Sequence, residues 1–341
     1  FMRWNKLVPA GVALLVMVVV QAWPFAKGDQ LVYRKKYAMG TVFEIVAYGP
    51  SPERTARAIE QTFKEVVRLD HVMSDYIPSS DLSRINRTAH YRAEPVPDDL
   101  YNVIQQSLVY SRLSAGEFDI TVGPLARLWK AEIRDGTVPS QAEEDKLRRC
   151  VGWRKITLTP PDRVEFRSPC MAIDLGAIGK GYAVDRAAAI LRSHGIRRAL
   201  ISAGASTFYA MGSPPGRSAW VVHLRDPSGK LGPEVRLNGN SVSTSEQTHD
   251  PEPGKGPFGD IIDPAKGVPV KTSDSVSVVA RSATASDALS TTLLLMGPAR
   301  GKALVKKLRE VAAIWISRQG KSEMFSTGPR ISLNHAAGQN R

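Results

Sequence analysis

The amino-acid sequence predicts an α+β fold, and two observations support this class. Helical and strand-like segments mix along the chain without the strict alternation of a doubly wound α/β protein. Strand-like segments dominate after Arg198, where runs such as "RALISAG" and "SVSVVAR" are apolar or alternate. Of the 341 residues, 43% are hydrophobic, which is enough for a substantial core. Because neither a fixed-period repeat nor a clear linker is found, residues 29–330 are expected to form one domain.

The first element is an apolar leader, residues 1–28. Arg3 and Lys6 precede the uncharged run "LVPAGVALLVMVVVQAW", and Val20 and Ala22 suit a signal-peptidase site after Ala22. The run has a length at which a signal peptide and a membrane anchor look alike. The segment contains no cysteine, which excludes lipoprotein processing. We therefore expect an exported protein, periplasmic or on the outer face of the cytoplasmic membrane.

Turn and capping residues mark the elements of the first half of the domain. Met39 and Gly40 interrupt residues 30–49, which predicts two strands joined by a turn. Ser51 as N-cap and Pro52 in the first turn begin a helix with a regular apolar stripe. A second long helix is expected to end at Gly116 as C-cap. The other elements expected here are a short helix after a polar loop in 75–86, a short helix in 139–152 and a hairpin in 155–169.

Strands dominate the second half. They are predicted in 198–204, 219–227, 235–245, 275–281 and 312–318. Two helices, around 285–296 and 298–311, precede the last of these strands. A Pro- and Gly-rich loop is expected in 250–260, and a loose polar tail in 331–341.

The formal net charge of +13 favours anionic partners, such as a nucleotide or a membrane surface. The basic residues occur in short, separate groups without interleaved aromatic residues. A nucleic-acid partner is therefore not expected.

The chain contains only two cysteines, Cys150 and Cys170. They could pair in an oxidising compartment. Because nothing else in the sequence indicates a disulfide framework, we expect two separate, partly buried thiols.

The stretch "AIDLGAIGKGYAVDRAAAIL", residues 172–191, places three glycines and a lysine before a helix. The preceding "MAID" is typical of a strand end, and after Gly181 apolar residues recur at helical spacing. Gly176, Gly179 and Gly181 permit backbone conformations with positive φ and close approach of a ligand. Free N–H groups at a helix start, together with Lys180, favour an anion such as a phosphate. The alternative is a purely structural turn, because the pattern matches neither of the common phosphate-binding motifs.

A second informative stretch is "TASDALSTTLLLMG", residues 284–297. Asp287 and Thr291 are four residues apart, so both project from one face of the predicted helix. A carboxylate and a hydroxyl presented together suit a hard cation such as Mg²⁺. The alternative is that Thr284 and Asp287 form a capping box at the helix N-terminus.

Six segments, in this order, resemble the FAD:protein FMN transferases, the ApbE family. They are "MGT" at 39–41, "SDYIPSSDLSRIN" at 74–86, "GEFDITVGPLARLW" at 116–129, "IDLGAIGKGYAVD" at 173–185, "IIDPAKGVPV" at 261–270 and "ASDALSTTLLLMG" at 285–297. The resemblance covers almost everything after residue 30. It implies a single catalytic domain with a mixed, mainly antiparallel sheet and flanking helices.

The resemblance also implies a function. Members of this family bind FAD with Mg²⁺ and transfer the FMN moiety to a Ser or Thr hydroxyl of a target protein, releasing AMP. Some members instead hydrolyse FAD to FMN and AMP. The implied partners are FAD and an exported or membrane flavoprotein that carries a Ser/Thr flavinylation site. A transferase, an FAD pyrophosphatase and a non-catalytic FAD-binding protein are therefore all open.

The resemblance implies site residues one by one. Asp287 and Thr291 would bind Mg²⁺ with the backbone carbonyl of Ala177, and Ser290 is close enough in sequence to contribute. Lys180 would meet the FAD phosphates and take part in catalysis. The other positions that match FAD-contacting residues are Met39, Tyr76, Glu117, Phe118, Asp119, Asp174 and Ile261. Tyr76 could stack on a flat ring or merely cover the protein core.

Three positions depart from the family pattern. Asp260 stands where the family has a histidine before Ile-Ile/Leu-Asp-Pro, Glu246 replaces the glycine of Thr-Ser-Gly, and "GAS" at 204–206 replaces Gly-Gly-Asn/Asp. An attacking hydroxyl needs a proton acceptor, so the Asp260 carboxylate is a candidate general base. The alternative is that Asp260 only ends a flexible loop as a turn residue.

Overall fold

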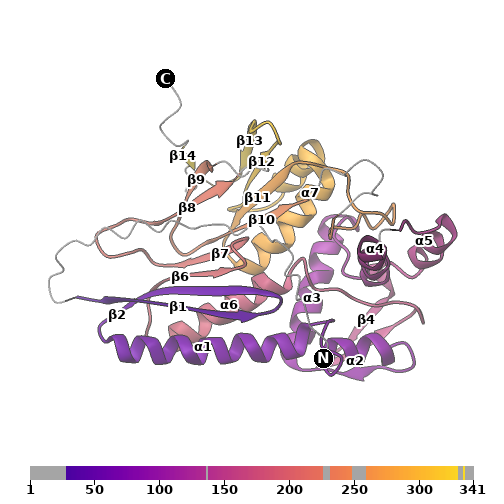
Figure 1. Cartoon of the computed structure of the whole chain (residues 1–341), viewed down its shortest axis with the longest axis horizontal. Helices are drawn as coiled ribbons and strands as arrows, with labels where there is room; N and C mark the ends of the chain where they lie inside the picture. The colour runs from indigo at the N-terminus through magenta and orange to yellow at the C-terminus, as the bar shows by residue number, and fades with distance from the viewer. Residues whose placement is uncertain (1–27, 136, 226–230, 248–258, 329–332, 335–341) are drawn as a thin grey trace, which may run out of the picture.

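The computed structural model describes residues 28–135, 137–225, 231–247, 259–328 and 333–334 (Figure 1). The expected leader, apart from Gly28, and most of the expected tail lie outside the described residues. Two tail residues, Leu333 and Asn334, form the short strand β14, which pairs with β9. Among the helices that the structure describes, none combines the length and the apolar character needed to span a membrane.

An eight-stranded antiparallel sheet forms the middle of the molecule, with strand order β1-β2-β6-β7-β10-β11-β12-β13. The predicted turn between the first two strands is present, since Met39 and Gly40 have φ of 51° and 71° and β1 pairs with β2 along its whole length. An α+β fold with a mainly antiparallel sheet is therefore confirmed. The strands are β1 (Gln30–Ala38), β2 (Thr41–Gly49), β6 (Arg198–Ala203), β7 (Thr207–Met211), β10 (Ser241–Glu246), β11 (Ser275–Ala280), β12 (Ala312–Ile316) and β13 (Ser322–Ser326).

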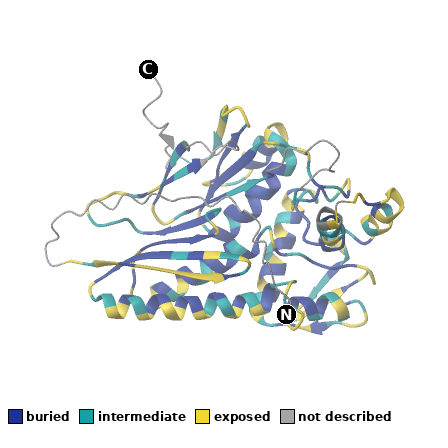
Figure 2. Cartoon of the chain, viewed as in Figure 1, coloured by how far each residue is buried: buried dark blue, intermediate teal, exposed yellow. Residues whose placement is uncertain are grey.

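The two faces of this sheet are covered by different layers, and β2 shows why. Its side chains alternate between the faces. Phe43 and Ile45 belong to the core under the helices α1 and α6, whereas Val46 and Tyr48 belong to the core under the small sheet β14-β9-β8. Figure 2 shows the large sheet mostly buried, while exposed residues lie on the outer side of α1. The covering elements are α1 (Pro52–Met73), α6 (Gly179–Ser193), α7 (Ala283–Val305), β8 (Trp220–Arg225), β9 (Leu231–Leu237) and β14 (Leu333–Asn334).

A second group of elements lies at one end of the large sheet (Figure 1). The Asn86 side chain fixes this group to the chain before the lysine turn, because it exchanges hydrogen bonds of 3.0 and 2.8 Å with the backbone of Ile173. The elements are α2 (Asp81–Thr88), β3 (Glu94–Pro95), α3 (Asp98–Leu113), α4 (Gly123–Asp135), α5 (Gln141–Arg148), the 3₁₀ turn η1 (Trp153–Lys155), β4 (Ile156–Thr159) and β5 (Arg163–Phe166).

Most predicted helix starts are confirmed. Pro52 is the first residue of α1, and the Ser51 hydroxyl accepts the Arg54 N–H at 3.4 Å. The end of α3 differs slightly. The helix α3 ends in a Schellman motif, in which Ala115 (φ 56°) takes the left-handed position and Gly116 follows it. The predicted cap at Gly116 is therefore wrong by one residue.

Two further boundaries differ from the sequence predictions. "MAID" is not a strand, because Ala172 forms only an isolated bridge with Val122. The two helices predicted around 285–296 and 298–311 are present as the two halves of α7, separated by the non-helical Gly297 (φ 68°, ψ 172°), and Pro298 begins the second half. The second half ends at Val305, earlier than predicted. Proline is tolerated there because it starts the second half, where its missing N–H costs little.

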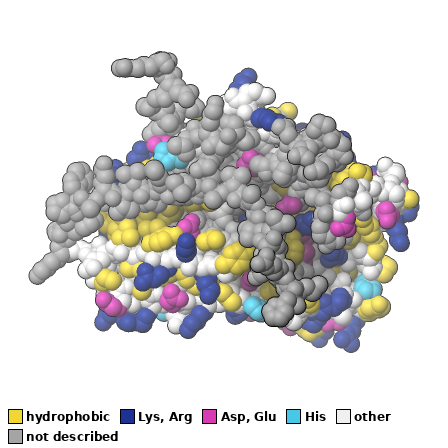
Figure 3. All heavy atoms as spheres, viewed as in Figure 1, with side chains coloured by type: hydrophobic (Ala, Val, Ile, Leu, Met, Phe, Trp, Pro, Cys, Tyr) yellow, Lys and Arg dark blue, Asp and Glu magenta, His cyan; other side chains and the backbone are white. Residues whose placement is uncertain are grey.

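Charged side chains of both signs share the surface of α1. Figure 3 shows Lys and Arg interspersed with Asp and Glu along the edge where this helix runs. Arg68 contacts both Glu65, at 2.8 Å, and Asp99, and Arg186 contacts Glu65 at 3.3 Å. Part of the surplus positive charge is thus neutralised locally.

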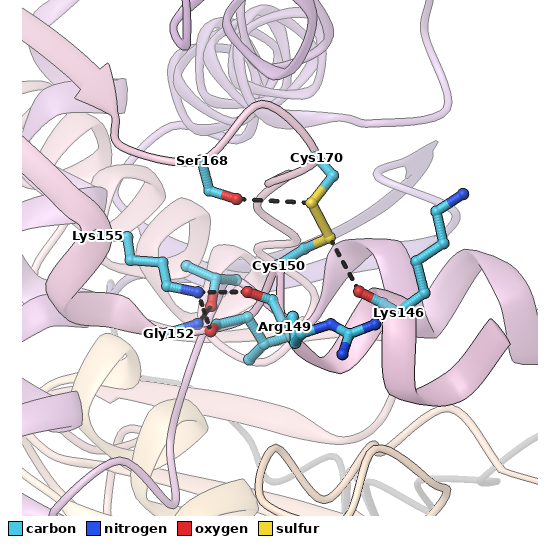
Figure 4. The surroundings of a disulfide bond; sticks show 9 residues. Lys146, Arg149, Cys150, Gly152, Lys155, Ser168 and Cys170 are labelled. Atoms are coloured by element: carbon cyan, nitrogen blue, oxygen red, sulfur yellow. Dashed lines mark hydrogen bonds between the residues drawn. A yellow bond between two sulfur atoms is a disulfide. The ribbon is translucent and has the colours of Figure 1, made fainter. Parts of the chain in front are cut away.

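The expectation of two separate thiols is wrong, because Cys150 and Cys170 form a disulfide with Cα atoms 5.4 Å apart (Figure 4). The reason is the β4–β5 hairpin between them, in which Ile156 pairs with Phe166. Cys150 and Cys170 lie just outside these paired residues, so the hairpin brings them together. The hairpin predicted from the sequence was therefore already an indication that the two cysteines lie close together. The bond joins the end of α5 to the segment that enters the lysine turn.

Loss of this disulfide is expected to lower the free energy of unfolding by about 3 kcal/mol, the size typical for a loop of this length. Chemical denaturation with and without reductant measures the change. The Cys150→Ala/Cys170→Ala variant is the control, because its stability should not respond to reductant. Two free thiols per chain in the untreated native protein would contradict the bond.

Candidate active site

The lysine turn places Lys180 in the first turn of α6. The helix begins at Gly179, three residues earlier than the sequence pattern indicates. Gly176, Gly179 and Gly181 do not have positive φ. Lys180 Nζ donates a hydrogen bond to the carbonyl oxygen of Gly176 at 3.0 Å. The N-cap residue, Ile178, has no side chain that could cap the helix. This helix start therefore needs an acceptor from elsewhere.

Asp287 supplies that acceptor and so brings the two motifs of the sequence together. Its Oδ2 accepts the N–H of Gly181 at 2.8 Å, across 106 residues of chain. A Cβ atom on Gly181 would lie 2.2 Å from the carbonyl oxygen of Ala283 and 2.7 Å from Asp287 Cβ. Only glycine permits this approach of α6 to α7.

The capping-box alternative for Asp287 is not observed. The N-cap of α7 is Ser282, and the Asp185 carboxylate of α6 accepts both the N–H and the hydroxyl of Thr284, at 2.8 and 2.6 Å. Burial raises the pKa of Asp185, although these hydrogen bonds oppose the shift. The Asp287 carboxylate therefore does not cap its own helix.

Hydroxyl groups surround the next turn of α7. Thr291 Oγ1 lies 2.9 Å and Ser290 Oγ 2.8 Å from Ser245 Oγ of β10. Ser290 also donates to the carbonyl oxygen of Asp287 at 2.9 Å and is fully buried. Ser245, which the sequence did not single out as a ligand, thus orients the Thr291 hydroxyl.

A cavity of about 960 Å³ collects the predicted site residues. Among the described residues that line it, Asp287 and Thr291 come from α7, and Tyr76, Lys180 and Asp260 from three other parts of the chain. The remaining predicted residues on its wall are Met39, Glu117, Phe118, Asp119, Asp174, Ala177 and Ile261. Ser290 is not on the wall and lies behind Thr291 and Ser245.

Asp119 lines the cavity, but its carboxylate is already engaged. Oδ1 accepts the N–H and the hydroxyl of Thr121 at 2.9 and 2.6 Å, and Oδ2 accepts the N–H of Trp153 at 2.9 Å. Burial raises the pKa of Asp119, and these hydrogen bonds oppose the shift. Asp119 therefore joins the segment after α3 to Trp153, which follows Cys150 of the disulfide. Neighbouring Glu117 forms an ion pair with Arg300.

Lys130 of α4 is a cavity residue that the sequence reasoning missed. Its Nζ donates to Tyr76 Oη at 2.7 Å and lies 3.9 Å from Asp174 Oδ2. Burial opposes the charge of Lys130, but Asp174 and Tyr76 outweigh it and raise the pKa. The only available signal was its place directly after the "GPLARLW" segment, and a lysine on a helix is usually solvated.

The cavity is acidic. Lys130 and Lys180 are the cationic side chains among its described lining residues. Burial and the Asp174 charge raise the pKa of Asp75, while Lys130 opposes the shift. The acidic wall therefore favours a cation over an anion. The acidic residues on the wall are Asp70, Asp75, Glu117, Asp119, Asp174, Glu246, Asp260 and Asp287.

Comparison with known proteins decides the family, because the model of the ApbE family matches residues 39–315. The chain belongs to the ApbE family. It is 29% identical to the FAD:protein FMN transferase of Escherichia coli K12 and 30% identical to that of Treponema pallidum, over 83% of each chain. The apo flavinyl transferase ApbE of Pseudomonas stutzeri superposes with a TM-score of 0.75 at 27% identity, over 88% of this chain and 95% of the other.

Two of the three departures from the ApbE pattern line the cavity. Asp260 and Glu246 lie on its wall, on either side of the segment 248–258 that is outside the described residues. Ser206 is not on the wall, and its carbonyl oxygen accepts the Thr244 N–H at 2.8 Å. The departures that lie at the cavity are therefore Asp260 and Glu246.

Proposed function

We propose that this ApbE-family protein transfers FMN from FAD to a Ser or Thr hydroxyl of an acceptor protein, in a Mg²⁺-dependent reaction that releases AMP. The relatives named FAD:protein FMN transferase support the reaction. The observation that carries it is the Gly181–Asp287 hydrogen bond, which holds a cationic turn and a carboxylate at one cavity.

The oxygen atoms present at the cavity suit a magnesium ion in their chemistry. The Asp287 carboxylate, the Thr291 hydroxyl and the Ala177 carbonyl supply hard oxygen donors, and the acidic wall favours a cation. No group of three or more His, Cys, Asp or Glu suited to a metal occurs among the described residues, so the donor set would be mixed. When bound, Mg²⁺ would neutralise charge on the diphosphate oxygens.

The proposed reaction is a displacement at phosphorus. The acceptor hydroxyl oxygen bonds to the FMN phosphorus, the bridging P–O bond breaks, and the electron pair leaves with AMP. Lys180, in the first turn of α6, stabilises the negative charge on the phosphate oxygens. The hydroxyl proton passes to Asp260, whose exposed carboxylate lines the cavity.

We also propose that the protein works outside the cytoplasm. The Cys150–Cys170 disulfide supports this, since such bonds persist in oxidising compartments. Its acceptor is then an exported or membrane flavoprotein. If residues 1–28 stay uncleaved, they would hold the enzyme at the membrane; nucleic acid is not a proposed partner.

The test is incubation of the protein with FAD, Mg²⁺ and a threonine-bearing acceptor, followed by mass spectrometry. An FMN adduct on the acceptor supports the transferase. Free FMN with no adduct means that water replaces the hydroxyl, as in an FAD pyrophosphatase. Unchanged bound FAD means a non-catalytic binding protein.

Asp260→Asn is expected to slow FMN transfer by about 10²- to 10⁴-fold, the usual contribution of a general base. FAD affinity should stay equal or tighten, because a negative charge near the diphosphate is removed. Stopped-time transfer assays and FAD titration measure the two effects. Asp260→His, which restores the family residue, is the companion variant. If it raises activity, the aspartate is a handicap, and unchanged rates in both variants exclude Asp260 from the mechanism.

A further inference from the structure

Lys130 turns into the cavity rather than into water. Its neighbour Trp129 is buried and donates its indole N–H to the Gly267 carbonyl at 3.0 Å, which fixes this part of α4. The Lys130 side chain is only 33% exposed, whereas Arg127 on the same helix is exposed and does not line the cavity. Lysine normally keeps its ammonium solvated, so this position requires compensating partners.

Those partners are Tyr76 and Asp174. The Lys130 ammonium donates to Tyr76 Oη at 2.7 Å and lies 5.2 Å from the centre of the Tyr76 ring. Asp174 Oδ2, 3.9 Å away, balances the charge. Lys130 therefore fixes the hydroxyl end of Tyr76.

The Tyr76 ring itself is not a cover for the core, because the residue is 74% exposed while it lines the cavity. Its backbone N–H is held by the Ser74 hydroxyl at 3.3 Å. A tyrosine whose ring hydroxyl and backbone N–H are both hydrogen-bonded loses little freedom when a ligand stacks on its ring. Stacking of a base on an aromatic side chain is a common source of affinity for nucleotides.

We propose that Lys130 is a positioning residue, which holds the Tyr76 ring as a stacking surface for a heteroaromatic ring of the dinucleotide. The inference rests on the proposed FAD-binding function. It assigns Lys130 to the ring of the ligand and Lys180 to the phosphates.

The contacts between the two lysines support this division. Asp174 Oδ1 accepts the N–H of Gly176 at 2.7 Å, and the carbonyl oxygen of Gly176 accepts from Lys180. Asp174 thus lies between the lysines and faces Lys130 with its other oxygen. The charge of the Lys130 ammonium is already balanced by Asp174, and the ammonium donates to Tyr76. Lys130 therefore attracts a phosphate less strongly than Lys180 does.

The experiment compares ligands with and without phosphate. Dissociation constants for FAD and riboflavin are measured by flavin fluorescence, and those for ADP and adenosine by competition with FAD. Lys130→Met is expected to raise the dissociation constant of FAD about tenfold. It should raise that of riboflavin equally if the flavin ring stacks on Tyr76, or that of adenosine equally if the adenine ring does. In turnover, Lys130→Met should raise the KM for FAD while kcat is kept. Lys130→Arg should restore binding. Arg127→Met is the control for charge alone, because Arg127 does not line the cavity but its charge still acts on Asp75 of the wall. Its effect on binding should be smaller than that of Lys130→Met and should not single out riboflavin or adenosine.

Two further variants make the result decisive. Tyr76→Ala should lose as much affinity as Lys130→Met, and the double variant no more, since both act through one ring. Lys180→Met should weaken FAD and ADP but neither riboflavin nor adenosine. If Lys130→Met shows that same phosphate-only pattern, or leaves all four ligands unchanged, the inference is overturned. If the wild-type protein itself binds no FAD, the proposed function fails instead.

Discussion

Replacing Asp287 with alanine is expected to reduce FMN transfer by at least about 100-fold, because even an outer-shell partner of a metal contributes about 10- to 100-fold. Asp287 is 5% exposed, lines the cavity and is the one charged group among the proposed Mg²⁺ ligands. Its loss would leave Thr291 and the Ala177 carbonyl, which are neutral donors and bind the cation more weakly. Transfer rates measured across a series of Mg²⁺ concentrations test this expectation.

The same substitution also removes the acceptor of the Gly181 N–H, so Asp287→Asn is needed to separate the two roles. Asparagine keeps the volume and an oxygen that accepts this hydrogen bond, but it has no charge. The asparagine variant should unfold at the wild-type temperature and yet be as inactive as the alanine variant. Full activity of Asp287→Ala at low Mg²⁺ would exclude the metal role. Activity in the asparagine variant alone would show that Asp287 acts by holding Gly181.

Gly181→Ala is expected to lower the free energy of unfolding by about 1–3 kcal/mol, the usual cost of an extra methyl group in a filled space. The new Cβ would meet the Ala283 carbonyl oxygen at 2.2 Å, and backbone cannot turn aside as a flexible side chain can. The helices α6 and α7 must then separate, which moves Lys180 away from Asp287. We expect weaker FAD binding together with a lower midpoint of thermal unfolding.

Gly179→Ala is the matched control, two residues earlier in the same helix. Its Cβ would lie 3.6 Å from Met39 Cε and 3.7 Å from Leu175 Cβ, which are ordinary contacts. Since alanine favours a helix over glycine by about 1 kcal/mol, stability should be unchanged or slightly higher. Equal midpoints for the two variants would show that the approach of α7 is not what requires glycine at position 181.

The sequence by itself determined the features that depend on neighbouring residues. The Met39–Gly40 turn, the N-cap at Ser51 and the hairpin before Cys170 follow from backbone preferences and hydrogen bonds within a few residues, so the local pattern predicts them. The lysine turn and the Asp287–Thr291 pair were recognisable for the same reason. The family resemblance added their roles, but it could not place them relative to one another.

Only the tertiary structure decided which distant groups meet. It brought the Gly181 N–H to Asp287 and the Trp153 N–H to the Asp119 carboxylate, and it turned Lys130 toward Tyr76. The last contact shows the physical reason. Lys130 and Tyr76 are 54 residues apart, and nothing in either segment selects the other. Their distance is fixed by the packing of α4 and of the loop before α2 around one cavity, which depends on the whole core and not on any local pattern.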